Sequence, residues 1–167
     1  MDDATREKLG VAPLLPWLKK INALKNKKEL LEFIAESHRT GLGVLWGMYV
    51  SRDDKNSAKN TLILVQGGLS LPDRDYYLAE DDESKRVRAE FIKYIPRLLS
   101  LVGYTKKDAE YTAKIVMQME TEMAKASMTR TERRDPHAQY NKHTTSKLQK
   151  EAPAIDWKKY FSLTYAG

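Results

Sequence analysis

Residues 66–78 read "QGGLSLPDRDYYL" and lie between two stretches whose apolar residues follow different periods. Just before this run the side chains alternate with a period of two, which is typical of a β-strand. After it, apolar residues recur every three or four positions, which indicates amphipathic helices. The run itself contains two glycines, a Pro-Asp step, an arginine between two aspartates and two adjacent tyrosines. A simple connection needs no such composition, so the run is a candidate site.

The segment before this run predicts two strands. Residues 44–51, "VLWGMYVS", combine aromatic and β-branched residues with a period of two, which is the pattern of a strand. Residues 52–60, "RDDKNSAKN", predict a polar turn, and residues 61–66, "TLILVQ", predict a second strand. Together they predict a short β-hairpin-like excursion over about residues 44–66.

Helices are predicted before the hairpin. Residues 12–24 place leucines and an isoleucine on one side at helical spacing, with a proline near the start, where its missing N–H does least harm. Asn26 followed by Glu29 resembles a capping box and predicts the start of a second helix. Gly41 predicts the C-terminal stop of that helix.

Longer helices are predicted after the run. Residues 81–103 place an apolar stripe on one face, and Pro96 in the interior predicts a kink or a break. Thr105 with Asp108 predicts the start of the next helix. That helix carries methionines between Met117 and Met128, which we interpret as core rather than as an adaptable binding surface.

The last part of the chain, from residue 135 on, predicts loops and short helices capped by Thr145 and Asp156. The fold class predicted for the whole chain is therefore mainly α, a helical lobe with one short hairpin.

Composition bounds the function classes. The chain has 167 residues, which fits one domain, and a net charge of +6. Its basic residues are spread beside acidic ones along helices, apart from "RTERRD" at 130–135, so we expect no nucleic-acid partner. No stretch approaches the roughly 20 apolar residues of a membrane span. Cysteine is absent, which excludes disulfides and thiolate chemistry in this chain.

Recognisable catalytic constellations are missing. The three histidines are His38, His137 and His143, and the first lies on the apolar side of a predicted helix, as a packed or hydrogen-bonded residue. The other two are six positions apart, a spacing that matches no helical ligand pair. The chain has no HExxH, no GxSxG and no phosphate-binding glycine motif. We therefore predict no catalytic, cofactor-binding or metal-binding residue in this segment.

Several blocks nevertheless resemble one family. "DDKNS" at 53–57 followed by "GGLSLPDRDYYL" at 67–78 resembles the neprilysin and endothelin-converting-enzyme family of zinc metalloendopeptidases. "MDDATREKLGVAPLLPWLKKI" at 1–21, "RRDPHAQYNKHT" at 133–144 and "DWKKYF" at 156–161 are similar to further elements of that family, in the same order. The blocks span nearly the whole chain, and the run at 67–78 is the most specific.

The resemblance implies a parent enzyme that hydrolyses peptides with zinc. The family's zinc helix, third ligand, catalytic aspartate and substrate-aligning Asn-Ala pair match no position here, so no functional residue carries over. We therefore expect residues 1–167 to be one incomplete segment, an N-terminal-half fragment that forms mostly the helical lobe covering the active-site cavity. Alone it should be inactive and without zinc.

The resemblance also implies the partners. The parent enzyme would bind peptide substrates. The fragment would pack against the missing catalytic lobe of the same chain, and when isolated it could self-associate. The lack of cysteine fits a bacterial member of the family. The compartment of the fragment itself stays open, and a parent of this kind is expected to be periplasmic or extracellular.

Two other function classes remain as alternatives, a stand-alone helical interaction module and a weak nucleic-acid binder acting through residues 130–135. Within the family reading, we interpret the opening run as a structural anchor between helices, with a direct substrate contact as the alternative. Proline and aspartates suit a short helix start, arginine binds carboxylates or carbonyls in a bidentate way, and glycine allows close backbone approach. The residues concerned are Gly67, Gly68, Pro72, Asp73, Arg74, Asp75, Tyr76 and Tyr77.

Overall fold

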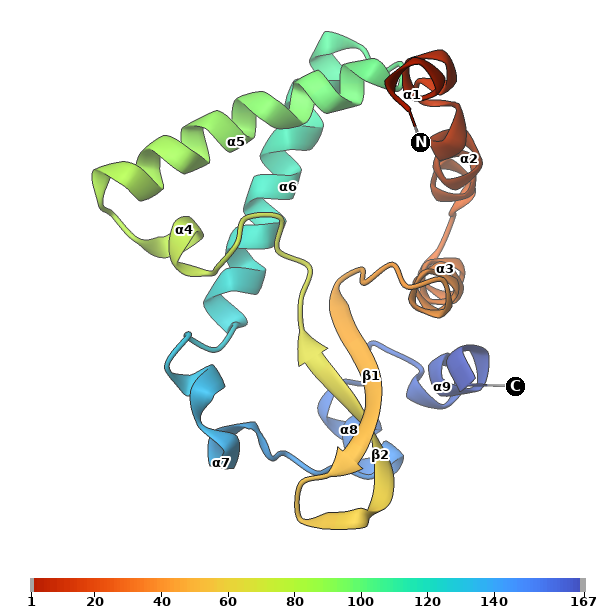
Figure 1. The fold of residues 1–167 in the computed structure, drawn as a ribbon, viewed down its shortest axis with the longest axis vertical. Coiled ribbons are helices and arrows are strands. Elements are labelled where there is room, and N and C mark those ends of the chain that lie inside the picture. Colours follow the sequence, from red (N-terminus) through yellow and green to blue (C-terminus); the bar gives the residue numbers. More distant parts are fainter. Residues whose placement is uncertain (1, 166–167) are drawn as a thin grey trace.

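The computed structural model describes residues 2–165, and it confirms a mainly α chain with one antiparallel hairpin (Figure 1). Within that range the α-helices are α1 (Asp3–Leu9), α2 (Leu15–Ala23), α3 (Lys27–Arg39), α4 (Asp75–Leu78), α5 (Asp82–Leu101), α6 (Lys106–Ala126), α7 (Pro136–Gln139), α8 (Thr145–Glu151) and α9 (Trp157–Tyr165). Two short 3-10 helices are η1 (Ala12–Leu14) and η2 (Glu132–Arg134), and the strands are β1 (Trp46–Asp53) and β2 (Asn56–Gln66).

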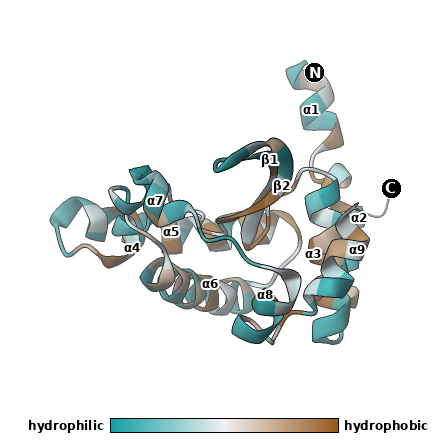
Figure 2. Ribbon diagram, turned by 90° about the horizontal axis from the view of Figure 1, so that it is seen from below, coloured by the Kyte–Doolittle hydropathy of each residue, from teal (hydrophilic) through white to brown (hydrophobic). Residues whose placement is uncertain are grey.

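The hairpin is longer at its tip than the sequence pattern predicted. Trp46 pairs with Gln66, and the register runs without interruption to Arg52 opposite Asn60, with an irregularity before Asp53 pairs with Asn56. The prediction of a polar turn over residues 52–60 was therefore wrong, because most of these polar residues belong to the strands. Figure 2 shows the reason, since the tip is hydrophilic and only the base, which faces other elements, is hydrophobic. Backbone pairing extends the ladder beyond its hydrophobic base.

The capping residues predicted for the helix ends are confirmed at Asn26, Thr105 and Gly41, and the cap of α8 lies one residue earlier than predicted. The Asn26 side chain accepts from the Glu29 N–H at 3.0 Å, and Thr105 accepts from the Asp108 N–H at 3.2 Å. Gly41, at φ +82°, follows the end of α3 as predicted. Thr145 was the wrong cap for α8, because the hydroxyl of Thr144 accepts from the Lys147 N–H instead.

Pro96 does not break α5. The helix continues through it from Asp82 to Leu101, so of the predicted kink or break, the break is wrong. Proline removes one intrahelical donor, but α5 packs along α6 (Figure 1). Ile95, next to Pro96, is buried.

An aromatic cluster joins the C-terminal helix to the hairpin. Tyr160 is fully buried, and its hydroxyl lies 2.6 Å from His38 Nδ1 of α3 and accepts from Trp46 Nε1 of β1 at 3.1 Å. Trp157 packs on Trp46 with ring centroids 5.8 Å apart. This core of α3, α9 and the hairpin base confirms His38 as a hydrogen-bonded interior residue.

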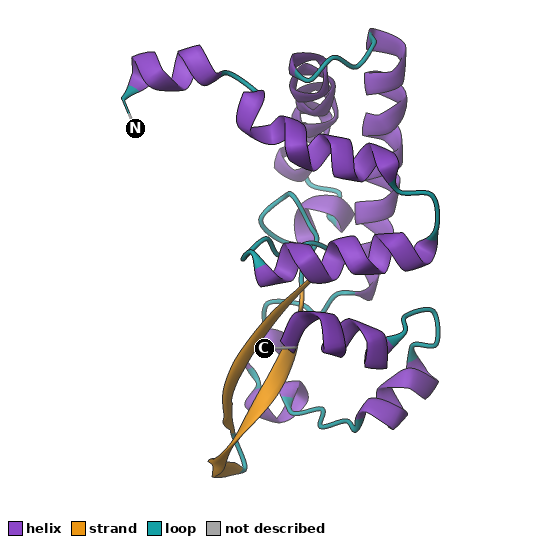
Figure 3. Cartoon of the chain, turned by 90° about the vertical axis from the view of Figure 1, so that its right-hand side faces the viewer, coloured by secondary structure: helices purple, strands orange, loops and turns teal. Residues whose placement is uncertain are grey.

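The second packed group consists of α4, α5 and α6, with the run at 66–78 leading into it from β2 (Figure 1). At the other end of the chain, α1 extends away from the remaining helices and has no buried residue (Figure 3). In the part of the chain that the structure describes, no helix has the length and apolar character needed to cross a membrane.

Candidate functional site

The run at 66–78 is fixed to α6 through one buried carboxylate. Glu120 Oε1 accepts from Ser70 Oγ at 2.7 Å, and Oε2 accepts from the Ser70 N–H at 3.1 Å and from the Tyr77 hydroxyl. The same tyrosine oxygen accepts from the Leu71 N–H at 2.8 Å. Burial, together with the nearby Glu120 carboxylate, raises the pKa of the Tyr77 phenol above its usual range. Tyr77 therefore stays protonated and donates, and we call these four residues the Tyr77–Glu120 anchor.

Arg74 joins the run to the end of the same helix. Its Nη1 donates to the carbonyl oxygen of Ser127 at 2.9 Å, at the negative end of the α6 dipole. The predicted bidentate contact is not formed, since Nε is buried and has no hydrogen-bond partner among the described residues. A buried donor of this kind costs about 1–3 kcal/mol when it is unpaired.

Asp73 makes an ion pair next to Arg74. Arg130 Nε donates to the buried Asp73 carboxylate at 2.8 Å, and this bond is the main reason why the pKa of Asp73 is lowered. Asp73 also accepts from the Asp75 N–H at 3.1 Å, at the start of α4. The short helix α4 thus begins three residues after Pro72. Its first N–H is bound by the Asp73 side chain, so Asp73 rather than Pro72 stabilises the start of the helix.

Gly68 confirms the predicted close approach of the backbone. It has φ +81°, and a Cβ there would lie 2.4 Å from Met123 Cε and 2.8 Å from the carbonyl oxygen of Leu45. Any side chain would collide with α6 and with the entry to β1. Glycine at 68 is therefore what lets the run pass between the hairpin and α6.

A second connection joins the hairpin tip to the segment after η2. The Asp53 carboxylate accepts from Lys142 Nζ, from the Tyr140 hydroxyl at 3.0 Å and from the Lys55 N–H at 2.9 Å. The Lys142 bond, followed by the Lys55 N–H, lowers the pKa of Asp53 to about 2. Asp53 was expected in a solvated turn, which was wrong, because Asp53 is buried under residues that come 87 and 89 positions later.

Sequence reasoning missed Glu120 as well as Asp53. A signal for Glu120 was present, since it lies at helical spacing among buried alanines of α6, Ala113 and Ala124. A carboxylate on the buried stripe of a helix needs donors from elsewhere in the fold. The methionines of that helix are only in part the predicted core, because Met119 is 55% exposed while Met117 and Met123 are half-buried.

The two later histidines, His137 and His143, have different hydrogen-bond partners. His143 bonds Glu151 Oε2 and the Asn141 carbonyl at 2.6 Å each, and the His137 N–H donates to Asp135, the N-cap of α7. Among residues 2–165 no group of three or more histidine, cysteine, aspartate or glutamate residues could hold a metal ion. The described part of the chain therefore does not fit a zinc site.

Comparison with known proteins agrees with this architecture. The model of peptidase family M13 matches residues 1–167. An endothelin-converting enzyme homolog of Locusta migratoria is 33% identical over 166 residues, 95% of this chain and 23% of the relative. Mouse endothelin-converting enzyme 1 is 32% identical over 94% of this chain and 21% of its own length.

Two bacterial structures share the fold. The zinc metalloprotease Zmp1 of Mycobacterium tuberculosis, solved with an inhibitor, superposes with a TM-score of 0.89 at 32% identity, over 98% of this chain and 25% of the other. PepO of Lactobacillus rhamnosis has a TM-score of 0.82 at 18% identity, over 96% and 26%. These neighbours are in keeping with the predicted bacterial origin.

The fold and the family match thus place this mainly helical chain among the metallopeptidases. The chain belongs to peptidase family M13, whose members are zinc metallopeptidases and include the endothelin-converting enzymes. It spans about a quarter of the length of the relatives that it matches.

Proposed function

We propose that this chain is the part of a neprilysin-like zinc metalloendopeptidase that forms the helical lobe restricting access of peptides to the active site, and that it is inactive alone. The observation that carries the proposal is the family match over residues 1–167 in a chain whose sequence has no HExxH. The zinc ligands then belong to other parts of a longer protein. In this proposal the lobe limits the size of the substrate that reaches the active site and supplies no catalytic residue.

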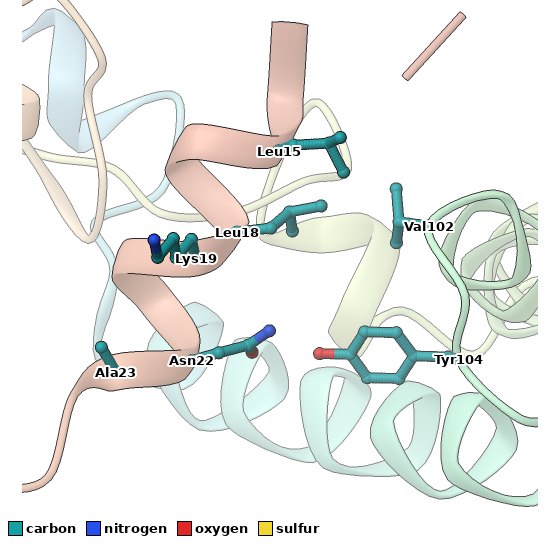
Figure 4. Close-up of a pocket in the computed structure, with 7 residues that line it drawn as sticks. All are labelled: Leu15, Leu18, Lys19, Asn22, Ala23, Val102 and Tyr104. Carbon is teal, nitrogen blue, oxygen red and sulfur yellow. The ribbon is translucent and has the colours of Figure 1, made fainter. Parts of the chain in front are cut away.

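Two apolar surfaces of the helices support the proposal that this chain packs against the rest of a larger protein. A groove of about 470 Å³ lies between α2 and the α5–α6 turn, where Leu15 and Leu18 point toward Val102, and Asn22 points toward Tyr104 (Figure 4). Exposed apolar residues also follow one face of α6. We propose that the remainder of the peptidase covers these faces, since large exposed apolar patches usually mark interaction surfaces.

Activity of the purified chain tests the first part. Metal analysis after dialysis should find no stoichiometric zinc, and a quenched fluorescent peptide should not be cleaved. Turnover that a chelator abolishes would contradict the proposal. A full-length member of the family measured in parallel supplies the positive control.

Substrate size tests the second part. A lobe that limits entry predicts that the full-length peptidase cleaves a short peptide much faster than the same sequence held in a folded protein. The second substrate needs a flexible insertion loop, so that the sequence itself is accessible. Equal kcat/KM for the two substrates would show that the lobe does not restrict access.

A further inference from the structure

We propose that the groove between α2 and the α5–α6 turn holds a segment of the same peptidase that lies outside residues 1–167. The segment places a large apolar side chain between Leu15, Leu18 and Val102, and its main chain bonds to Asn22 and Tyr104. This inference rests on the proposed function and adds to it the chemistry of the covering segment.

The first observation is that both walls of the groove are held by contacts outside it. On one side, α2 packs on α3 through Trp17 and Phe33, whose rings meet edge to face with their centroids 5.9 Å apart. On the other side, the Tyr104 N–H donates to the Leu99 carbonyl at 3.1 Å and closes the turn after α5. The groove therefore needs no partner to form.

The second observation is the size and character of the groove. Its volume of about 470 Å³ lies within the range of about 300–1,000 Å³ that is usual for binding pockets. Leu15, which is 51% exposed, and Leu18 point toward Val102 (Figure 4). No carboxylate lines the groove, and Lys19, the one charged lining residue, points away from Val102 (Figure 4). This part of the groove suits an uncharged, apolar side chain.

The third observation is the polar end of the groove. Asn22 points toward Tyr104 (Figure 4), and neither side chain has a hydrogen-bond partner among the described residues. Asn22 is exposed and Tyr104 is half-buried, so water reaches this end. A segment that covers the groove removes this water and must replace its hydrogen bonds, because an unpaired buried polar group is costly. The Asn22 amide both donates and accepts, which matches the C=O and N–H of a peptide main chain.

The source of the segment follows from the length of the relatives. The chain spans 23% of the locust relative and 25% of the Zmp1 chain, so most of a peptidase of that length lies outside it. A segment of the same protein is present at a high effective concentration, whereas a separate peptide must bind from solution. A shallow, solvent-accessible groove of this kind therefore favours a covering segment from the same protein.

Alkylation of a cysteine in the groove tests the covering. Leu15→Cys changes an exposed residue of a chain that has no cysteine of its own, so it should leave the fold intact. Mass spectrometry then follows alkylation at position 15 in the isolated chain and in the full-length peptidase. The rate should be at least tenfold lower in the full-length protein. Ser146→Cys, at an exposed position of α8, is the control and should react at similar rates in both.

The hydrogen bonds are tested in the full-length protein that carries Leu15→Cys. Asn22→Ala and Tyr104→Phe should each raise the alkylation rate at position 15 about two- to tenfold, as expected for the loss of one hydrogen bond. Asn60→Ala, at an exposed position of the hairpin, is the matched control and should have no effect.

A photoreactive benzoylphenylalanine in place of Leu15 identifies the segment. In the full-length protein it should form a cross-link within the same chain, to a peptide outside residues 1–167 that carries a large apolar residue. A cross-link to another protein overturns the proposed source.

The other outcomes are equally decisive. Equal alkylation of position 15 in the isolated and full-length proteins, or equal slowing at position 146, shows that the groove is not specifically covered and overturns the proposal. Protection that Asn22→Ala and Tyr104→Phe leave unchanged overturns the hydrogen-bonded segment. None of these results changes the role of the lobe in restricting access, which the two substrates of different size measure separately.

Discussion

Tyr77 and Glu120 lie 43 positions apart in the sequence, and in the interior the phenol of Tyr77 donates to the carboxylate of Glu120. Glu120 accepts in addition from the hydroxyl and the N–H of Ser70, at 2.7 and 3.1 Å. One carboxylate thus satisfies three donors of the run at 66–78. This arrangement explains the serine and the tyrosine of the run, because these three donors share an acceptor only if the turn and α6 meet in this register.

Tyr77→Phe tests the anchor. The change removes the donor to Glu120 and leaves the Leu71 N–H without its acceptor, so the free energy of unfolding should fall by about 1–3 kcal/mol. Chemical denaturation of wild type and variant measures the difference. Tyr94→Phe, on the exposed face of α5, is the matched control and should change stability little. Equal effects of the two substitutions would mean that the buried hydroxyl contributes nothing.

Arg74→Ala tests whether the arginine supports the fold or binds substrate. Losing its charged hydrogen bond to Ser127 removes about 1.5–3 kcal/mol of stabilisation. Because the unpaired Nε–H disappears with it, we expect a smaller net loss and a modestly lower melting temperature. Turnover by the full-length enzyme, measured at a permissive temperature, should change little. Arg134→Ala provides a control for the lost charge. A large loss of turnover with unchanged melting would instead place Arg74 in substrate binding.

Local patterns predicted much of this fold. The capping residues Asn26 and Thr105 and the stop at Gly41 were predicted correctly because each acts on neighbours within about one turn. The base of the hairpin followed from its period of two. The errors at Pro96 and Thr145 have different origins. Tertiary contacts influence whether a helix continues through a proline, whereas Thr144 and Thr145 are adjacent residues of the same type and the composition does not choose between them.

The pairing of the blocks could not be predicted from the sequence. "DDKNS" meets the Tyr140–Lys142 segment through Asp53, and "LPDRDYY" meets the end of α6 through Tyr77 and Arg74. A single sequence contains the partners but no distance between them. Even so, the interpretation of the run as a structural anchor agrees with these contacts.

Acid should weaken the connection at Asp53. The pKa of Asp53 is lowered to about 2 in the folded chain, from an ordinary value of 3.8. A lowered folded-state pKa contributes stability that is complete above about pH 4 and is lost as the pH falls toward 2. The melting-temperature difference between wild type and Asp53→Asn should therefore be constant near neutral pH and shrink across this window. Asp54→Asn, at the exposed neighbour, corrects for general effects of removing a carboxylate, and a difference that stays constant down to pH 2 would contradict the pKa shift.

Exposed apolar residues predict that the isolated chain self-associates. On α6, Tyr111, Ile115 and Met119 recur at four-residue spacing and are 66%, 36% and 55% exposed, so they form one uncovered stripe. Leu14, just before α2, and Ile21, within α2, are also exposed. Light scattering across a concentration series should show a rising mass, and a hydrophobic dye should bind.

Two substitutions on α6 tie this behaviour to the stripe. Tyr111→Ser with Met119→Ser should lower both the scattering and the dye fluorescence, because they remove most of the exposed apolar area of that face. Lys114→Ser, on the same helix, replaces one polar residue with another and should leave both signals unchanged. If the wild-type chain is monomeric and silent toward the dye at high concentration, it covers its own apolar surface, and the stand-alone interaction module becomes the better description. If it associates but the double substitution has no effect, the contact lies elsewhere, and the exposed face carrying Leu14 and Ile21 is the next to be tested.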